Sequence, residues 1–449
     1  MSEFIVGLDI GTTAIKVFIG KKKESGKIEI IGNGATESIG VDMGLVVNPG
    51  QAAQSIRVAV KQAEQMAGVE VKQVYVGVAG HHIQSRAVQG TATRQDPDDL
   101  ITIEEVFNLH DAQKHTHIED GMEIIDIMDQ SYAVDREKCL DPVGRIGHQL
   151  EGTFSIIIGR KDCIKKIIKS VSEAGYALKG LILQSLASAE SVLCEDDKRV
   201  GVCLVDIGGG TTDIAIFKQG FMRHIHSVPF AGNQITYAIE IMYNIPKRSA
   251  ENIKIKYGTC LPEAIKNPDS FIAVPRFKGG NPKEINHRTL ANTIKAQVEL
   301  ILGLIKEELN KNNYIGQLQA IILTGGGSLI RHIKQLSEYH IPDLVTDIDS
   351  IDEEYFENLP AELKQPIYAT GLGLVIAAFK QEEEEQRIKP PIEPIVEDSK
   401  PDEEPALTEE EIIRLQKEEE QKKSFGEKVR GWFKSFNPFG EDDSSQDMY

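Results

Sequence analysis

Apolar residues occur in short runs rich in β-branched side chains, and two of these runs each lead through a polar, glycine-containing turn into a second apolar run. The first stretch is residues 4–19, FIVGLDIGTTAIKVFI, and the second is residues 201–217, GVCLVDIGGGTTDIAIF. Such runs on both sides of a tight turn predict two strands joined as a β-hairpin. Because the pattern occurs twice, about 200 residues apart, we expect a duplicated domain with a ligand held between its halves.

The rest of the pattern alternates short strands with amphipathic helices. Helical spacing of apolar residues occurs in residues 49–67, 161–174, 235–243, 249–257 and 289–309, and strands are expected at residues 26–34, 74–78, 180–183 and 320–323. This alternation predicts an α/β architecture with a largely parallel or mixed central sheet. Between residue 81 and about residue 159 the pieces are shorter, with a helix over 101–110 and strands over 124–134 and 154–158. That region is expected to be a small α+β insertion.

Small residues mark two further features of the folded part. The strand over 320–323 runs into Gly325, Gly326 and Gly327 and an expected helix over 328–336, whose N-terminus could meet a nucleotide. Residues 184–193 and 370–379 are helical segments of small side chains, as suits a hinge between two lobes. The folded part is expected to end near Lys380.

The C-terminal residues follow a different pattern. Residues 381–423 hold 16 acidic and 7 basic side chains and almost no aromatic residues, which predicts a disordered linker with a net charge of −9. In residues 424–439, SFGEKVRGWFKSFNPF, five apolar side chains fall within about 100° of a helix circumference, with basic residues beside and opposite them. The apolar residues are Phe425, Val429, Trp432, Phe433 and Phe436, and the basic ones are Lys428, Arg430 and Lys434.

This composition predicts an interfacial membrane helix, followed by an acidic tail over 440–449. The alternatives are a protein-docking motif or a helix that folds back on the body. A single helix of this size should bind a membrane weakly and reversibly, so stable attachment requires several copies together.

Composition narrows the class of protein. The net charge of −19 at pH 7 argues against nucleic acid as a partner. The five cysteines have no CxxC spacing and are expected to be reduced thiols of a cytosolic protein. No apolar run approaches the 18 residues of a membrane span, and the N-terminus enters a strand directly, so we expect no signal peptide. His110, His115 and His117 lack a metal-ligand spacing and are expected to be solvated surface residues.

The two hairpin turns carry the chemistry. They share an Asp–Gly–Thr–Thr pattern, with Asp9, Gly11, Thr12 and Thr13 in the first turn and Asp206, Gly208, Thr211 and Thr212 in the second. Glycines there, including Gly209 and Gly210, leave backbone N–H groups unobstructed and free to take positive φ, so that they can converge on phosphate. The aspartates are placed to hold Mg²⁺ through its waters. Lys16 could reach a phosphate, and Gln184 could orient an attacking water. Together these features predict a site for Mg-ATP.

The same segments resemble the actin-like ATPase superfamily, which also includes heat-shock chaperones and sugar kinases. GLDIGTTAIK and VDIGGGTTDIAIF are similar to its phosphate motifs, ILTGGGSLI to its adenosine motif, and QSLASAES and YATGLGLVIAA to its hinge helices. Within it, the chain closely resembles the FtsA family of bacterial cell-division proteins. The supporting stretches are VYVGVAGHHIQS, DPVGRIGHQLEGTFSIIIG, GNQITYAIEIMYNIPKRSAENIKIKYG, PKEINHRTLANTI and the tail helix.

The resemblance implies a fold and a set of site residues. The fold would be a two-lobed actin-like ATPase with duplicated ribonuclease-H-like cores. Its parts would be the first lobe (1–84 and 161–200), an inserted subdomain (85–160), the second lobe (201–230 and 315–367) with an outer subdomain (231–314), and a returning hinge helix (368–380). By the resemblance, Gly232, Glu251 and Lys254 would line the adenosine pocket with the three glycines at 325–327.

The resemblance also implies a function. FtsA-like proteins bind ATP, form actin-like filaments and tether the tubulin-like FtsZ ring to the inner face of the cytoplasmic membrane at the division site. The FtsZ C-terminal tail would bind the outer subdomain, other division proteins the inserted subdomain, and anionic lipid the tail helix. ATP would act mainly as a switch for conformation and assembly, with at most slow hydrolysis. The acidic residues after Phe439 could weaken attachment to anionic lipid.

Three alternatives within the superfamily compete with this prediction. A sugar kinase would need a carboxylate base beside a sugar pocket, and no such residue can be placed. A chaperone-type ATPase would carry a β-rich substrate domain after residue 380, which this chain lacks. The rod-shape protein MreB is shorter and has no counterpart of residues 381–449.

Overall fold

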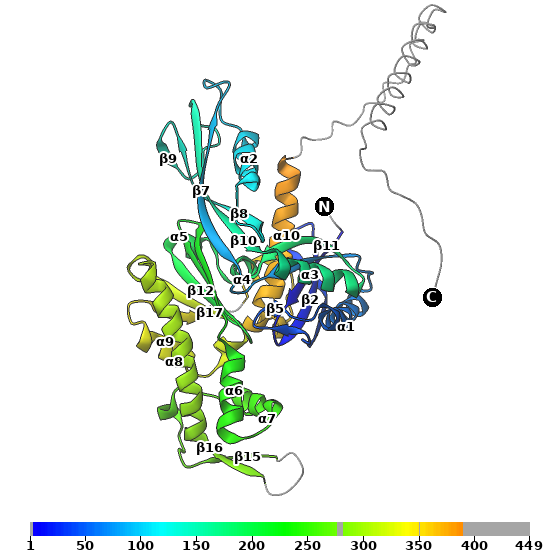
Figure 1. Cartoon of the computed structure of the whole chain (residues 1–449), viewed down its shortest axis with the longest axis vertical. Helices are drawn as coiled ribbons and strands as arrows, with labels where there is room; N and C mark the ends of the chain where they lie inside the picture. The colour runs from blue at the N-terminus through cyan, green and yellow to red at the C-terminus, as the bar shows by residue number, and fades with distance from the viewer. Residues whose placement is uncertain (1–2, 276–281, 350, 389–449) are drawn as a thin grey trace, which may run out of the picture. The chain divides into compact units, whose positions relative to one another are not determined.

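The computed structural model of the chain describes residues 3–275, 282–349 and 351–388. Within these residues two α/β lobes lie side by side, with one small subdomain attached to each lobe (Figure 1). The membrane-helix prediction falls on residues 424–439, which lie outside the described residues.

Each lobe is built on a five-stranded sheet of the same topology. The first sheet has the order β11-β6-β1-β2-β3 and the second the order β18-β17-β12-β13-β14. In both sheets the first three strands pair antiparallel and the two later strands add in parallel. The strands of the first sheet are β1 Ile5–Ile10, β2 Ala14–Lys22, β3 Ile28–Glu37, β6 Gln73–Val78 and β11 Ala177–Leu183; those of the second are β12 Val202–Ile207, β13 Thr212–Lys218, β14 Phe221–Val228, β17 Ala320–Thr324 and β18 Val345–Ile348. The common strand order confirms the predicted duplication, and both polar turns stand between antiparallel strands as expected.

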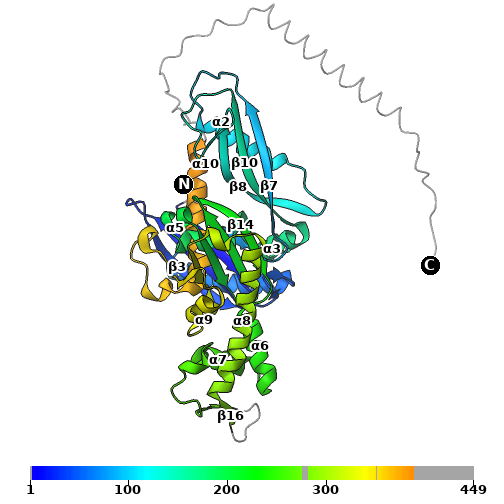
Figure 2. The ribbon, with the colours of Figure 1, turned by 90° about the vertical axis from the view of Figure 1, so that its left-hand side faces the viewer.

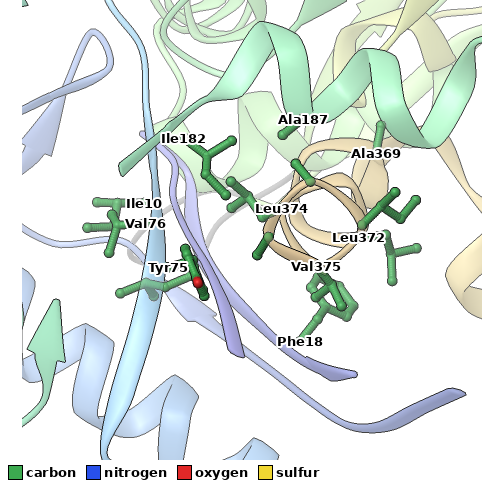
Figure 3. Packing of buried hydrophobic residues seen from close by; sticks show 14 of the residues in the cluster. Ile10, Phe18, Tyr75, Val76, Ile182, Ala187, Ala369, Leu372, Leu374 and Val375 are labelled. Atoms are coloured by element: carbon green, nitrogen blue, oxygen red, sulfur yellow. The ribbon is translucent and has the colours of Figure 1, made fainter. Parts of the chain in front are cut away.

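Helices cover both faces of the first sheet. On one face lie α1 (Pro49–Ala67) and, packed beside it, α3 (Lys161–Ala174); on the other lie α10 (Ala369–Ile388) and, against it, α4 (Gln184–Val192). Glycines allow this close approach: a Cβ at Gly34 would lie 2.0 Å from the Ala59 carbonyl oxygen of α1, and one at Gly20 would lie 2.4 Å from Val375 of α10. Figure 3 shows the second interface, where Val375 of α10 lies beside Phe18 of β2.

The inserted subdomain has a sheet and a core of its own. Its strands are β7 Gln84–Thr93, β10 Gln149–Arg160, β8 Met122–Val134 and β9 Glu137–Cys139, in this spatial order, and helix α2 (Ile103–Asp111) packs against β7 and β10. Its buried cluster, centred on Leu150, Phe154 and Ile156, is separate from that of the lobe. The predicted α+β insertion is therefore present.

The second lobe carries an outer subdomain of three helices and a small hairpin (Figure 2). The helices are α6 Gly232–Tyr243, α7 Lys247–Tyr257 and α8 His287–Lys311, and the hairpin strands are β15 Phe271–Val274 and β16 Lys283–Asn286. Helices α5 (Glu195–Val200) and α9 (Ile333–His340), the strand pair β4 (Val41–Asp42) and β5 (Leu45–Val46), and short 3₁₀ turns make up the remaining regular elements. Among the described helices, none is long and apolar enough to cross a membrane.

Three local predictions differ from the structure. Strand β7 was not predicted, because its alternating small and polar residues, QSRAVQGTAT, form a largely exposed edge strand without an apolar face. The helix expected over 328–336 is instead a 3₁₀ turn (Gly326–Leu329) followed by α9, because His332 between them has the left-handed φ of 68°. His110 is half-buried, not solvated, because its Nδ1 lies 2.9 Å from Asp129 Oδ1; His115 and His117 are exposed as predicted.

The first lobe extends further along the chain than the sequence indicated. Helix α10 continues to Ile388, eight residues beyond Lys380. Its acidic residues look like the start of the linker, yet Glu382 is buried, accepts a hydrogen bond from the Tyr75 hydroxyl and pairs with Lys179. Glu383 pairs with Lys22. Charge pairs that composition cannot reveal therefore keep this segment helical.

The crossing of α4 and α10 should tolerate no side chain at Gly373. A Cβ there would lie 1.7 Å from the Ala187 carbonyl oxygen, so Gly373→Ala must push the two helices apart. We expect it to lower the free energy of unfolding by about 2 kcal/mol, measured by urea denaturation. As a matched control, Gly303→Ala on α8 meets no atom within 4 Å and should stabilise the chain by about 0.5–1 kcal/mol. Equal effects of the two substitutions on the free energy of unfolding would show that a Cβ at Gly373 does not force α4 and α10 apart.

Candidate functional site

The turns of the two predicted hairpins meet face to face although they belong to different lobes. A Cβ on Gly209 would lie 1.9 Å from Thr13 Oγ1, and one on Gly210 would lie 2.4 Å from Thr12 Oγ1. The Thr12 hydroxyl also accepts a hydrogen bond from the Gly44 backbone N–H at 2.9 Å. The site is therefore formed by both halves of the duplicated fold.

The glycines of the second turn are required for a different reason from the one predicted. Positive φ does not occur at Gly11 or at any of Gly208, Gly209 and Gly210. At Gly209 and Gly210 a Cβ would collide with the opposite turn, whereas at Gly11 and Gly208 it would crowd a backbone carbonyl of the same turn. Bare backbone N–H groups at such a junction can converge on an anion.

Asp9 is the central group of the first turn. It is buried at the end of β1, its Oδ2 lies 3.5 Å from Lys16 Nζ, and its Oδ1 accepts a hydrogen bond from Gln184 Nε2 at 3.2 Å. Burial raises the pKa of the Asp9 carboxyl, and the charge of Lys16 opposes that rise. The structure thus brings Asp9, Lys16 and Gln184 together.

Asp206 is the corresponding carboxylate of the second lobe. Its Oδ2 accepts hydrogen bonds from Ser188 Oγ at 2.8 Å and from Thr370 Oγ1 at 3.0 Å. Desolvation raises the pKa of Asp206, the two hydroxyls lower it, and the charge of Asp9 raises it further. Asp9 and Asp206 come from different lobes and lie near enough for their negative charges to interact unfavourably, which favours the binding of a cation beside them.

The predicted adenosine side adjoins the second turn. The Gly232 N–H, at the start of α6, donates to the Gly208 carbonyl at 3.1 Å. Lys254 Nζ donates to the Gly232 carbonyl at 3.0 Å and pairs with Glu251 Oε2 at 2.8 Å. Desolvation lowers the pKa of Lys254, and the Glu251 charge opposes that shift.

The three glycines after β17 complete this side of the site. A Cβ on Gly325 would lie 2.2 Å from Asp206 Oδ1, and one on Gly327 would lie 2.2 Å from Ile207 Cγ2, while one on Gly326 would make only an ordinary contact with Ile367 at 3.6 Å. All the predicted nucleotide residues thus lie in one region at the junction of the lobes. The predicted membrane residues lie outside the described residues.

Sequence reasoning missed three groups of the site. Asp213 is buried beside the second turn, and its Oδ2 accepts a hydrogen bond from Thr211 Oγ1 at 2.9 Å. Its signal was available, because the Asp follows the Thr–Thr pair and stands opposite Asp206 in the β12–β13 register. Ser188 and Thr370 were visible only as small residues of the predicted hinge helices.

Asp213 should make the stability of the chain depend on pH. Desolvation raises the pKa of this carboxyl to about 6, from 3.8. The folded state therefore holds a proton between about pH 4 and pH 6 that the unfolded state has released, so the free energy of unfolding should fall as the pH rises through this window. Asp213→Asn can keep the Thr211 hydrogen bond, and we expect it to gain at most about 3 kcal/mol at pH 7 and nothing at pH 4.

The measurement is urea unfolding of both proteins at pH 4, 5, 6 and 7. Asp196→Asn, at an exposed residue, is the control and should leave the pH profile unchanged. An Asp213→Asn profile parallel to that of the natural chain would rule out a titrating Asp213.

Comparisons with known proteins identify the family of the chain. A family model described as cell division protein FtsA matches residues 203–373, and one described as the SHS2 domain inserted in FtsA matches residues 80–158. The cell division protein FtsA of Pseudomonas aeruginosa is 34% identical over 384 residues, which cover 85% of this chain and 90% of that protein. FtsA of Escherichia coli K12 is 32% identical over 384 residues, which cover 83% of this chain and 90% of that protein. The chain belongs to the FtsA family.

Family membership settles the class left open by the sequence. The chain is a cell division protein of the FtsA type, and the SHS2 match falls on its inserted subdomain. It is therefore not assigned to the sugar kinases, the chaperones or MreB, whose motifs it shares in part.

Solved structures identify the fold. The PilM–PilN type IV pilus biogenesis complex aligns with a TM-score of 0.60 at 16% identity, over 84% of this chain and 98% of that one. MreB5 of Spiroplasma citri bound to ADP aligns with a TM-score of 0.51 at 16% identity, over 87% of this chain and 99% of that one. At such identities the similarity concerns the fold alone, which is the actin-like ATPase fold that the FtsA family was expected to have.

Proposed function

We propose that this FtsA-family chain is an ATP-binding scaffold that assembles into actin-like filaments and tethers the FtsZ ring to the inner face of the cytoplasmic membrane. The nucleotide part of the proposal rests on one observation above all: the two hairpin turns, each with its buried aspartate, meet at the junction of the lobes. Two lobes that meet at a phosphate site can close around a nucleotide and open without it.

The residues of this site fit Mg-ATP. The glycine-lined turns expose backbone N–H groups where a Cβ would collide, and Lys16 lies beside them, which suits phosphate. The two carboxylates suit a Mg²⁺ ion that keeps most of its waters and binds the phosphates as well. In this arrangement Asp9, Gly11, Thr12, Thr13, Lys16 and Asp206, with Gly208 to Thr212, would hold the phosphates and the cation. Gly232, Glu251, Lys254 and the glycines at 325–327 would hold the adenosine. Bound Mg²⁺ would supply charge neutralisation at the phosphates.

Gln184 and Asp206 are the groups that could support slow hydrolysis. Gln184 already donates its side-chain amide to Asp9, so it stands at the phosphate turn and could orient a water there. The hinge helices α4 and α10 contact this site directly through Ser188 and Thr370. This supports a role for ATP as a switch of lobe closure and subunit assembly more than as a source of energy for another reaction.

The partners follow from the family and from the outer surfaces. We assign the FtsZ C-terminal tail to the outer subdomain, residues 231–314, where Tyr237, Ile241, Met242 and Ile255 of α6 and α7 are exposed. Other division proteins would bind the inserted subdomain, residues 85–160. The predicted helix at 424–439 would bind anionic lipid, and the chain would then lie on the cytoplasmic face of the membrane at the division site.

Calorimetry and electron microscopy test the nucleotide and filament parts together. Titration of the full chain with ATP in Mg²⁺ should give binding, and the ATP-loaded chain should form filaments on a monolayer of anionic lipid. No heat of binding, or phosphorylation of a sugar at enzyme-like turnover, would overturn the proposal.

A further inference from the structure

The hinge helices α4 and α10 are joined by hydroxyl groups at the point where they cross. Ser188 Oγ of α4 lies 3.1 Å from Thr370 Oγ1 of α10. One turn further along α4, Ser191 Oγ donates to the Ala369 carbonyl at 2.7 Å. Ser188 and Ser191 are both fully buried. The absence of a side chain at Gly373, against Ala187, brings the two helices close enough for these contacts.

Two of these hydroxyls converge on one carboxylate oxygen of the other lobe. Ser188 and Thr370 both donate to Asp206 Oδ2, at 2.8 and 3.0 Å, whereas Ser191 makes no hydrogen bond to Asp206. The second carboxylate oxygen, Oδ1, points toward Gly325. One oxygen of the carboxylate is therefore held by the two hydroxyl groups, while the other lies toward the proposed nucleotide site.

The two hydroxyl groups suit an ionised carboxylate at Asp206. Hydroxyl donors to an ionised carboxylate form strong, short hydrogen bonds and stabilise its charged form. Asp206 needs that support, because desolvation and the charge of Asp9 both act against its ionisation. Alanine at residue 188 and valine at residue 370 would fill the crossing almost as well, so packing alone gives no reason for hydroxyl groups there.

We propose that Ser188 and Thr370 are positioning residues that hold Asp206 in place for a cation-bound nucleotide and tie its position to the two hinge helices. The proposal rests on the proposed ATP-binding function and extends it to the regulation of the same site. Any rotation of the lobes about the α4–α10 crossing moves both hydroxyls relative to Asp206. Conversely, a cation bound at Asp206 opposes such rotation. The bound nucleotide is thereby coupled to the orientation of the hinge helices.

The test compares nucleotide affinity with and without magnesium in the full chain. Ser188→Ala and Thr370→Val each remove one donor to Asp206 with little change of shape. Loss of such a supporting hydrogen bond typically costs 10–100-fold in metal affinity, so ATP affinity in Mg²⁺ should fall about tenfold. In EDTA the affinity of the same variants should change by less than about twofold, because Asp206 then holds no cation.

Ser191→Ala is the matched control. It removes an equally buried hydroxyl from the same helix and breaks a bond to α10, but leaves Asp206 untouched. It should bind Mg-ATP like the natural chain. Thr370→Ser keeps the hydroxyl and should restore most of the affinity lost in Thr370→Val.

The outcomes separate this inference from the proposed function. If the natural chain binds no nucleotide, the proposed function fails. If the natural chain binds Mg-ATP and both variants bind it equally well, or if Ser191→Ala is as defective as Ser188→Ala, the positioning role fails. If Ser188→Ala does not fold, Thr370→Val with Thr370→Ser decides the matter, and an equal loss in Mg²⁺ and in EDTA overturns the proposal.

Discussion

Gly209→Val should lower the affinity of the chain for ATP about 100-fold or more, which corresponds to about 2.7 kcal/mol. The new Cβ would lie 1.9 Å from Thr13 Oγ1, so the two phosphate turns must separate. The added methyl groups would then occupy the space between backbone N–H groups that must converge on phosphate. Because the turns belong to different lobes, this substitution also changes how the lobes meet.

The control for Gly209→Val is Gly316→Val. Gly316 lies in a short 3₁₀ turn with no atom within 4 Å of a Cβ, and its φ is not positive. Calorimetric titration with ATP in Mg²⁺ should show binding unchanged by the control and nearly abolished by Gly209→Val. Affinity retained in Gly209→Val would mean that the phosphate does not bind between these turns.

Trp432→Glu should reduce binding of the full chain to anionic vesicles at least tenfold. The substitution removes the largest apolar side chain of the predicted helix face, which is worth about 2 kcal/mol when buried, and it places a negative charge against anionic lipid. Ser435→Glu adds the same charge on the polar side of the helix and is the matched control. It should weaken binding much less.

Vesicle flotation at physiological salt measures both variants. Equal losses for Trp432→Glu and Ser435→Glu would show that only the added charge matters. Unchanged binding in both would remove residues 424–439 from membrane attachment altogether.

The sequence predicts much of the site because its chemistry depends on local patterns. The Asp–Gly–Thr–Thr turns, Lys16 and the glycines after β17 are each defined by a few neighbouring residues, and the repeat in sequence becomes a repeat of strand order. What the sequence could not show are contacts between distant segments. The partners of Asp206, for example, come from α4 and α10, 18 and 164 residues away.

The difference between local patterns and distant contacts also explains the errors in the predicted fold. Strand β7 is held by its pairing with β10, and the end of α10 by pairs with Lys22 and Lys179, none of which is visible in the local pattern. The region after the glycine step has an apolar pattern typical of a helix, but the backbone turns at His332, whose side chain bonds to Thr259 at 2.7 Å. Tertiary contacts decide these three segments.

We propose above all that the chain connects FtsZ to the membrane under the control of ATP. Flotation of fluorescent FtsZ with anionic vesicles tests it most directly, with ATP and Mg²⁺ present and with either the full chain or one that ends before residue 424. FtsZ should float with the vesicles only when the full chain is present, and Gly209→Val should reduce the floating fraction. FtsZ that floats equally with the shortened chain, or that never floats with the full one, would contradict this function.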